Sequence, residues 1–324
     1  MGFRNIRALF NPDLYHGWGK SRKFFEGWYY KFVNRNEDRI FAIIPGVSMD
    51  KSGSKHSFIQ VLDGIDLKSE YYTFDFLDFH SETNELDIQI GNNSFSNSRI
   101  SLDLPGIKGD LSFYDLVKWP SKWSSPGIMG PYSFVPFMEC NHGILSMNHR
   151  IEGEMVVNNR RIDFSGGRGY TEKDWGRSFP EAYIWMQSNH FSPDIGSLKV
   201  SVAKIPWLGS SFIGFISGLW FEGEIIEFTT YNNSSIKRLE ITDQEVALEI
   251  ENRNYRMVIG CSRPLATKLA SPVSGNMSSH IHESMRADID LRLYDRANGR
   301  LLAEAEGRNS ALEVAGKVEQ LLKG

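Results

Sequence analysis

Cysteine is scarce in this chain of 324 residues, which contains only Cys140 and Cys261. Two cysteines so far apart provide neither the closely spaced ligands of a zinc site nor a disulfide framework, although one disulfide between them is compatible with the sequence. This usage favours a reducing compartment, and we expect a cytoplasmic protein.

Long hydrophobic runs are also missing. No window approaches 18 consecutive apolar residues, so we predict no membrane-spanning helix. The first residues reach Asn11-Pro12-Asp13 before an apolar core of signal-peptide length develops, and we expect no export signal. Ile6 stands where an N-myristoylation motif has Ser or Thr, so lipidation is not expected.

Nucleotide-binding and hydrolase motifs are absent: the chain has no GxxxxGK[ST] loop, no GxGxxG opening a helix and no GxSxG elbow. This argues against P-loop kinases, dehydrogenases with a Rossmann fold and α/β-hydrolases. A formal net charge of -4, with scattered Lys and Arg, argues against nucleic acid as a partner.

Aromatic residues, by contrast, are abundant at 13% of the chain. They favour strands and line apolar pockets. Short runs with period-two alternation recur between residues 39 and 119 and again between residues 198 and 294, whereas helical periodicity is almost absent. This pattern predicts an all-β protein of two antiparallel domains, built as tandem barrels or sandwiches.

The domain boundary is predicted from Gly166-Gly167-Arg168-Gly169, which interrupts the alternation. We therefore expect residues 1–165 and 166–324 to form the two domains. Just before the boundary, Asn158-Asn159 separates two alternating runs and predicts a tight hairpin, because Asn tolerates positive φ. Residues 311–322 have the spacing of a last short helix, or of a segment that begins as a strand.

The segment FFEGWYYKFV, residues 24–33, is the first that suggests chemistry. As a strand it places Glu26, Trp28, Tyr30 and Phe32 on one face. A carboxyl group buried beside aromatic rings loses solvation and can stay protonated, so Glu26 is a candidate proton donor. The alternative is that Glu26 pairs with an Arg or caps the strand, and that the aromatic residues are ordinary core.

The segment GYTEKDWGRSFP, residues 169–180, has glycines near both ends and is predicted as a loop. Such a loop would present Tyr170, Glu172, Asp174 and Trp175, of which the two acids are candidate catalytic groups and the two aromatics candidate ligand contacts. Alternatively, it is an interdomain linker in which Asp174 pairs with Lys173 or Arg177.

Residues 182–191 are predicted as a strand that places Tyr183, Trp185, Gln187 and Asn189 on one face. Aromatic rings combined with amide groups suit an amphiphilic ligand that has one polar end. Core packing with satisfied amides is the alternative.

Histidines form two groups. His280 and His282 precede Glu283, but no third ligand with suitable spacing is evident, so no metal site is predicted. His142 follows Glu139 in the stretch PFMECNHGILSMNH, and this pair is a candidate for acid–base work or for hydrogen bonding to a ligand.

Four stretches, in this order, resemble the tocopherol cyclase family, including its bacterial members: SRKFFEGWYYKFV, VPFMECNHGILSMNHRIEGEMVV, GRGYTEKDWGRSFPEAYIWMQSNHF and ADIDLRLYDRANGRLLAEAEG. The resemblance covers nearly the whole chain. It implies two lipocalin-like β-barrel domains with a pocket near their junction. The chain looks shorter than the plant enzymes, lacking an insertion in its first half, and we expect no plastid transit segment, so the resemblance implies the fold more strongly than it implies tocopherol as substrate.

The resemblance also implies an isomerase that needs no cofactor and cyclises a prenylated quinol to a chromanol. Protonation of the alkene by Glu26 or Asp174 would give a tertiary cation, which the faces of Trp28, Trp175 or Trp185 could stabilise. The implied partner is an amphiphilic or isoprenoid small molecule, which is compatible with peripheral membrane contact. A non-catalytic carrier and a hydratase or pericyclase acting on a polyene are the alternatives.

Overall fold

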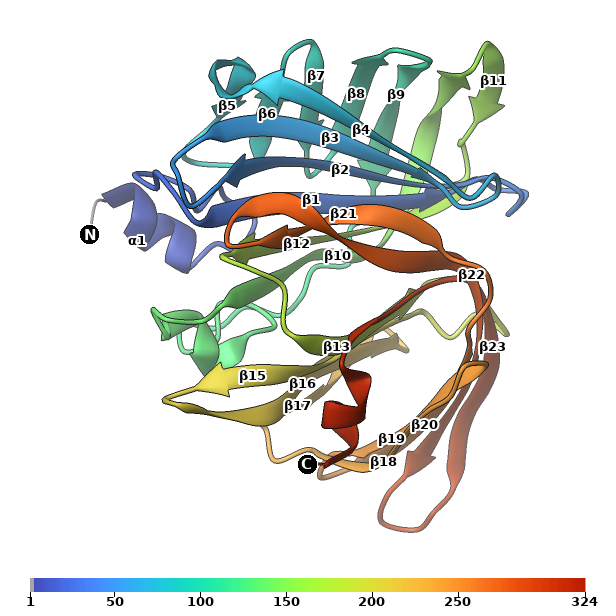
Figure 1. The fold of residues 1–324 in the computed structure, drawn as a ribbon. Coiled ribbons are helices and arrows are strands. Elements are labelled where there is room, and N and C mark those ends of the chain that lie inside the picture. The colour runs from blue at the N-terminus through green and yellow to red at the C-terminus, as the bar shows by residue number, and fades with distance from the viewer. Residues whose placement is uncertain (1–2, 324) are drawn as a thin grey trace. The chain divides into compact units, whose positions relative to one another are not determined.

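The computed structural model describes residues 3–323, which form mainly antiparallel strands (Figure 1). Within that range the strands make two large sheets, so the all-β prediction is confirmed. The helical elements are α1 (Phe3–Leu9) and three 3₁₀ turns, namely η1 (Phe76–Asp78), η2 (Gly130–Phe134) and η3 (Val318–Lys323). None of these described helices has the length and hydropathy needed to span a membrane.

The first sheet has twelve strands in the order β4-β3-β2-β1-β12-β10-β9-β8-β7-β6-β5, with β11 beside β10. Consecutive strands are mostly neighbours, but β12 returns to insert between β1 and β10. The strands are β1 (Phe24–Val33), β2 (Ile40–Met49), β3 (Lys55–Asp63), β4 (Lys68–Asp75), β5 (Phe79–Ser81), β6 (Asp87–Ile90), β7 (Asn93–Ser96), β8 (Arg99–Leu104), β9 (Ile107–Tyr114), β10 (Cys140–Val157), β11 (Arg160–Asp163) and β12 (Gly167–Gly176).

This sheet is open, so the predicted closure into a lipocalin-like barrel is wrong. Over residues 3–323, no pairing joins the edge strands β4 and β5. The chain passes between these edges through η1, where the Asp75 carboxylate accepts a hydrogen bond from the Leu77 amide. A capped 3₁₀ turn therefore connects β4 to β5, the two strands that would have to form hydrogen bonds with each other to close a barrel. The sheet instead bends, so that β1–β4 lie across from β5–β9 (Figure 1).

The second sheet has eleven strands in the order β17-β16-β15-β13-β23-β22-β20-β19-β18, and in the described residues it is likewise not closed. Outside this path, β14 pairs with β23 and β21 with β22. The strands are β13 (Ala182–Ser188), β14 (Phe191–Ser192), β15 (Ser197–Trp207), β16 (Ser210–Phe221), β17 (Glu224–Thr229), β18 (Ser235–Ile241), β19 (Glu245–Glu251), β20 (Tyr255–Ser262), β21 (Thr267–Val273), β22 (Asn276–Asp295) and β23 (Leu301–Gly316).

The chain divides into two compact units. The first contains the residues up to Phe179 together with Leu269–His280, and the second contains Pro180–Lys268 and the residues from Ile281 onward. β12 belongs to the first unit because it pairs with β1 and β10. Whether the chain folds as independent domains divided after residue 165 stays a prediction.

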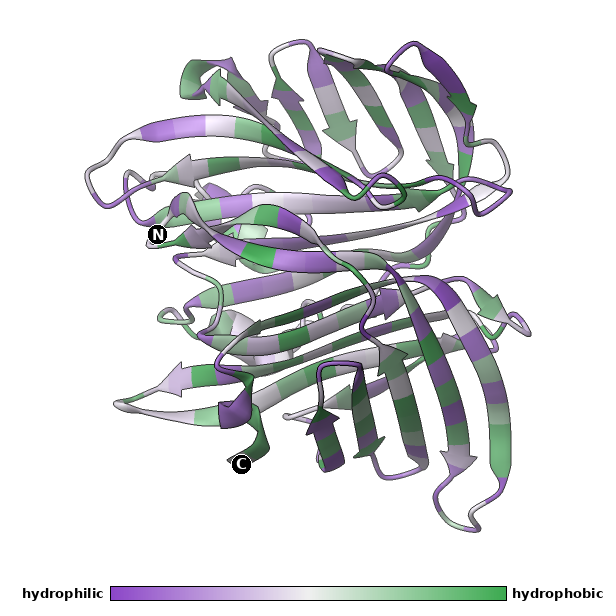
Figure 2. Cartoon of the chain, turned by 45° about the vertical axis from the view of Figure 1, so that its right-hand side comes forward, coloured by the Kyte–Doolittle hydropathy of each residue, from purple (hydrophilic) through white to green (hydrophobic). Residues whose placement is uncertain are grey.

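Strand faces follow the alternation of the sequence. Figure 2 shows apolar and polar bands crossing the strands, most regularly along β22 and β23. β1 has the predicted bounds, and its side chains Phe24, Trp28, Tyr30 and Phe32 lie in the core of the first unit. Burial of alternate apolar residues is what fixes the register of such strands.

The predicted hairpin is also confirmed. β10 and β11 are joined by Asn158 and Asn159, with φ of 49° and 64°, which is the geometry that two-residue hairpins favour. The C-terminal segment begins as strand β23 and ends in the 3₁₀ turn η3, so the amphipathic pattern there belongs to two elements.

Candidate functional site

β12 occupies the segment that we predicted as a loop, and that prediction is wrong for Gly169–Gly176. Its glycines do not form a turn but allow the strand to pack closely against its neighbour. A Cβ on Gly169 would lie 2.1 Å from Nε2 of His149, and a Cβ on Gly176 would lie 2.2 Å from the carbonyl oxygen of Glu139. Both neighbours belong to β10 or directly precede it, so these glycines let β12 lie against β10.

Because β12 is a strand, its candidate residues separate onto two faces. Tyr170, Glu172 and Asp174 are the register partners of Lys31, Tyr29 and Gly27 on β1. They therefore lie on the face opposite the hydrophobic core of the first unit. Thr171, Lys173 and Trp175 lie on the same face as that core.

The face opposite the core carries a cluster of four side chains, Tyr170, Glu172, Asp174 and His142, which we call the acid–base cluster. Nδ1 of His142 lies 2.8 Å from Oδ1 of Asp174, and Nε2 lies 3.3 Å from Oε2 of Glu172. The Tyr170 hydroxyl donates to Oε2 of Glu172 at 2.5 Å. One imidazole thus contacts two carboxylates, and all four residues are candidates predicted from the sequence.

The cluster is largely shielded from water. Tyr170, Glu172 and His142 are buried, whereas the Asp174 side chain remains 27% exposed. Burial and the neighbouring Glu172 carboxylate raise the pKa of Tyr170 well above its ordinary value, so this phenol stays a hydrogen-bond donor. Asp174 is the member of the cluster with the most access to solvent.

Cys140 adjoins the cluster, with its Sγ 3.9 Å from Oδ1 of Asp174. Burial, followed by the charges of Asp174 and Glu139, raises the pKa of this thiol well above its ordinary value. A nucleophilic thiolate is therefore disfavoured here. Proton transfer, rather than covalent catalysis by Cys140, is the chemistry that the surroundings support.

His142, Glu172 and Asp174 also have the ligand types of a metal site, with one ligand atom of each lying within 4.8 Å of the others. We predicted no metal from the sequence. In the described structure the imidazole nitrogens already lie at hydrogen-bonding or ion-pairing distance from the carboxylates. A cation would have to replace these contacts.

Glu26 lies on the other face of the sheet, away from the acid–base cluster. It is fully buried, and its Oε1 lies 2.6 Å from Nζ of Lys173. The backbone amide of His16 donates to both carboxylate oxygens, at 3.0 and 2.9 Å. Glu26 is thus paired with a cation, as in the alternative interpretation, but the partner is Lys173 rather than an Arg.

The two tryptophans of this face contact the same lysine. Nζ of Lys173 lies 4.7 Å from the ring centroid of Trp28 and 4.9 Å from that of Trp175. Trp175 also stacks on His16, with ring centroids 4.1 Å apart. Burial lowers the pKa of Lys173, and Glu26 opposes that effect. The aromatic faces that we expected around a substrate cation thus surround an internal one.

Two further candidates in the first unit are not members of the acid–base cluster. Tyr30 is in the core, where its hydroxyl donates to the Ser96 carbonyl and its ring stacks on Phe113. Glu139 is half-buried directly before β10, and its carbonyl accepts a hydrogen bond from the Arg177 amide.

The remaining candidates belong to the second unit. Tyr183, Trp185 and Gln187 alternate along β13 with residues of that unit's core, and all three are buried, as is Asn189 just beyond the strand. The Tyr183 hydroxyl donates to Oε2 of Glu313 at 2.7 Å. These residues form a separate aromatic and amide face on the second sheet.

Sequence reasoning missed two residues of the buried ion-pair network, Lys173 and His16. The position of Lys173 could have been predicted from a strand at 169–176. Because it falls between Glu172 and Asp174, its side chain must point to the opposite face of such a strand. No local pattern indicated that His16, in an irregular segment, would donate its backbone amide to Glu26.

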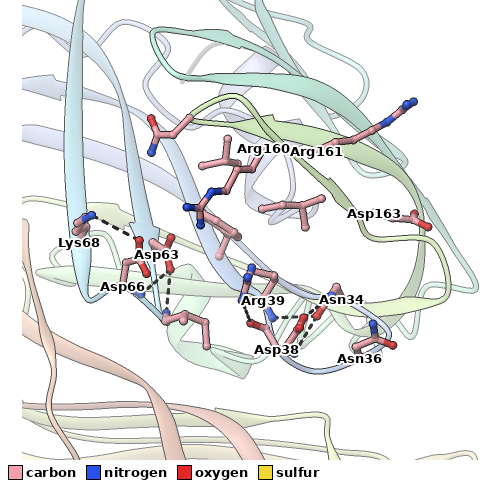
Figure 3. A pocket seen from close by; sticks show the side chains of 15 residues that line it. Asn34, Asn36, Asp38, Arg39, Asp63, Asp66, Lys68, Arg160, Arg161 and Asp163 are labelled. Atoms are coloured by element: carbon pink, nitrogen blue, oxygen red, sulfur yellow. Dashed lines mark hydrogen bonds and ion pairs between the residues drawn. The ribbon is translucent and has the colours of Figure 1, made fainter.

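The first unit also has a polar pocket of about 640 Å³ (Figure 3). It is formed by the β1–β2 turn, the β3–β4 turn and the β10–β11 hairpin. Asn34 lies seven residues along the chain from Gly27, the partner of Asp174, so roughly 20 Å of strand separates this pocket from the acid–base cluster.

The described residues define a two-sheet antiparallel protein whose first sheet carries a shielded acid–base cluster. A family model described as "Tocopherol cyclase-like" matches residues 108–316, which include the whole acid–base cluster but not Glu26. The chain belongs to the tocopherol cyclase-like family.

Curated relatives agree with this assignment. The chain is 25% identical over 198 residues to a probable chloroplastic tocopherol cyclase of Oryza sativa subsp. japonica. It is 24% identical over 192 residues to the chloroplastic tocopherol cyclase of Zea mays. Each match covers 56% of this chain and only 40% of the relative.

Solved structures share the fold at low sequence identity. CghA with Sch210972 has a TM-score of 0.57 and 11% identity, over 90% of this chain and 88% of CghA. A protein assigned as AttH from Nitrosomonas europaea has a TM-score of 0.51 and 14% identity, over 90% and 92% of the two chains. These likenesses establish the fold.

Proposed function

We propose that this protein is an isomerase that cyclises a prenylated quinol or a related isoprenoid lipid by proton transfer. The observation that carries the proposal is the position of His142 between the carboxylates of Asp174 and Glu172, within the segment that the family model matches. The curated relatives named tocopherol cyclase support the reaction class. The structure of CghA with Sch210972 supports a small-molecule ligand.

In this proposal the acid–base cluster holds and moves the proton. The imidazole of His142 contacts both carboxylates, which gives a proton a route from one carboxylate to the other. Asp174, the most exposed member, gives its proton to the alkene, whose π electrons form the new C–H bond and leave a tertiary cation. A lone pair of the phenol oxygen then forms the C–O bond. The phenol proton passes to the Asp174 carboxylate, so no atom is gained or lost overall.

The other members of the cluster prepare Asp174 for this role. His142 contacts both carboxylates and can carry a proton between them. Tyr170 donates to Glu172 and so fixes that carboxylate on the far side of the imidazole. Preorganised polar groups in a water-poor site need little rearrangement during the reaction, which is where much enzymatic rate acceleration arises.

Glu26 has no part in this proposal. Protonation of Glu26 would leave the buried Lys173 ammonium without its counter-ion, which is costly in the interior. We assign the Glu26–Lys173 pair to stability, and Trp28 and Trp175 to the environment of Lys173.

The experiment is a turnover assay with purified protein and a prenylated hydroquinone, followed by mass spectrometry of the product. The wild-type protein should give a chromanol of unchanged mass. Asp174→Asn should lower the rate by about 10²- to 10⁴-fold, as is typical for loss of a positioned general acid. Asp87→Asn, which changes an exposed carboxylate on β6, should leave the rate unchanged.

Other outcomes separate the alternatives. A product that gains one water would indicate a hydratase, and a product with only new carbon–carbon bonds would indicate a pericyclase. Ligand retention without turnover, unaffected by Asp174→Asn, would indicate a carrier and would contradict the proposal.

A further inference from the structure

The polar pocket of the first unit combines many charged side chains with an apolar base. It is lined by four aspartates and four basic residues, while Phe41 and Val157 beneath them are buried. The equal numbers suggest a neutral surface. The contacts of the individual side chains show, however, that the acidic residues have more partners within the protein than the basic residues.

Each aspartate of the pocket is already held by the protein. Asp63 accepts hydrogen bonds from the backbone amides of Ile65 and Asp66, and Asp163 accepts one from the amide of Ser165. Asp38 accepts a hydrogen bond from the side-chain amide of Asn34. Asp66 pairs with Lys68. Carboxylates with these roles stabilise the local turns and are poorly placed to bind a ligand as well.

The three arginines of the pocket differ in what their guanidinium groups contact. Arg161 pairs with Glu154 through both Nε and Nη2. Arg160, its neighbour in sequence, makes no ion pair or hydrogen bond through its side chain to any residue in the described range 3–323. Arg39 donates only to a backbone carbonyl, that of Asp38, at 2.6 Å. Two guanidinium charges on this pocket therefore have no carboxylate partner among the described residues.

Figure 3 shows how these arginines lie. The Arg160 side chain turns inward over the pocket, toward the side that carries Arg39 and Asp63, whereas Arg161 points away from it. Asn36 and Asn158 also line the pocket, and within the described chain their side chains make no hydrogen bond. The donors at this pocket that remain able to bind a ligand thus belong to two guanidinium groups, those of Arg39 and Arg160, and to the side-chain amides of Asn36 and Asn158.

We propose that this pocket is a second ligand site, separate from the acid–base cluster, that binds a small organic anion through phosphate or carboxylate oxygens. The planar fork of a guanidinium matches both of these groups and can bind them bidentately. A volume of about 640 Å³ accommodates a small molecule. The apolar base formed by Phe41 and Val157 provides a surface for the organic part.

Titration calorimetry of the full chain with phenyl phosphate tests this proposal, and the two adjacent arginines provide a matched pair of variants. Arg160→Gln and Arg39→Gln should each weaken phenyl phosphate binding at least tenfold. Arg161→Gln should change the affinity less than twofold, because its guanidinium is already engaged by Glu154. All three positions are at the surface of turns or the hairpin, so the fold should survive each change.

Inorganic phosphate and phenol separate the two parts of the ligand. Inorganic phosphate should bind several-fold more weakly than phenyl phosphate, and phenol should not bind measurably. Absence of phenyl phosphate binding at millimolar concentration would overturn the proposal. So would equal affinity losses in Arg160→Gln and Arg161→Gln, which would indicate general surface charge. Equal affinities for phosphate and phenyl phosphate would contradict the role of the apolar base.

Discussion

Nδ1 of His142 lies 2.8 Å from Oδ1 of Asp174, and the two residues are direct register partners on β10 and β12. The pairing of two strands from different parts of the chain therefore creates this contact. Glu172 reaches the other ring nitrogen from the next position on the same face. Each ring nitrogen thus lies close to a carboxylate oxygen, and the position of the imidazole follows from the register of the sheet.

Replacement of His142 by Gln should reduce turnover by about 10²- to 10⁴-fold, because the proton path between the carboxylates is lost. Substrate affinity should change little, and steady-state kinetics would separate the two effects. His80→Gln, an exposed histidine on β5, is the matched control. Equal turnover in His142→Gln and wild type would exclude His142 from the proton path.

Lys173→Met should destabilise the protein by about 3 to 5 kcal/mol, since it leaves Glu26 buried without its cation. Chemical denaturation followed by tryptophan fluorescence would measure this change. Lys118→Met removes an exposed lysine and should cost less than about 0.5 kcal/mol. The double variant Glu26→Leu, Lys173→Met should recover part of the loss. A single variant as stable as the wild type would contradict our assignment of the pair to stability.

Acid should destabilise the fold through His149, which is buried against Phe113. Burial lowers the pKa of His149 to about 3. Below pH 6.5 the unfolded state binds a proton that the folded state does not, so stability falls as the pH decreases toward 3. This residue alone should make the protein about 2 kcal/mol less stable at pH 5 than at pH 7.5. His149→Gln should flatten that part of the pH profile, and an unchanged profile would contradict the predicted role.

The thiols should be slow to react in the folded protein. Burial raises the pKa of Cys261 to about 12, and burial with nearby carboxylates raises the pKa of Cys140. Ellman's reagent at pH 8 should modify neither thiol quickly until denaturant is added. Asp174→Asn should speed modification of Cys140, because it removes the larger of the two main neighbouring charges. Rapid modification of native Cys140 would show that its surroundings differ from those described.

Features that depend on short stretches of sequence were predicted correctly. β1 coincides with the aromatic-rich segment 24–33 that we took as a strand, and the β10–β11 hairpin follows from Asn158-Asn159. Tyr170, Glu172 and Asp174 were predicted because one segment combines acids and aromatics, and His142 was predicted from its position beside Glu139. In each case the signal lies within a few consecutive residues.

The errors concern features that depend on distant partners. Gly169 and Gly176 suggested a loop, but their role is to allow β12 to approach β10. The partner of Glu26 could not be identified because Lys173 reaches it only through the β1–β12 pairing. Closure of a barrel depends on contacts between edge strands, and neither β4 nor β5 carries a local signal of whether they pair.

In the proposed reaction the protein transfers a solvent-derived proton to carbon. The most direct measurement is the mass of the chromanol formed from a prenylated hydroquinone in D₂O. The wild-type product should carry one deuterium on the carbon next to the new C–O bond, and Asp174→Asn should form at least a hundredfold less product. A cyclised product without carbon-bound deuterium, or one formed equally fast by Asp174→Asn, would contradict the proposal.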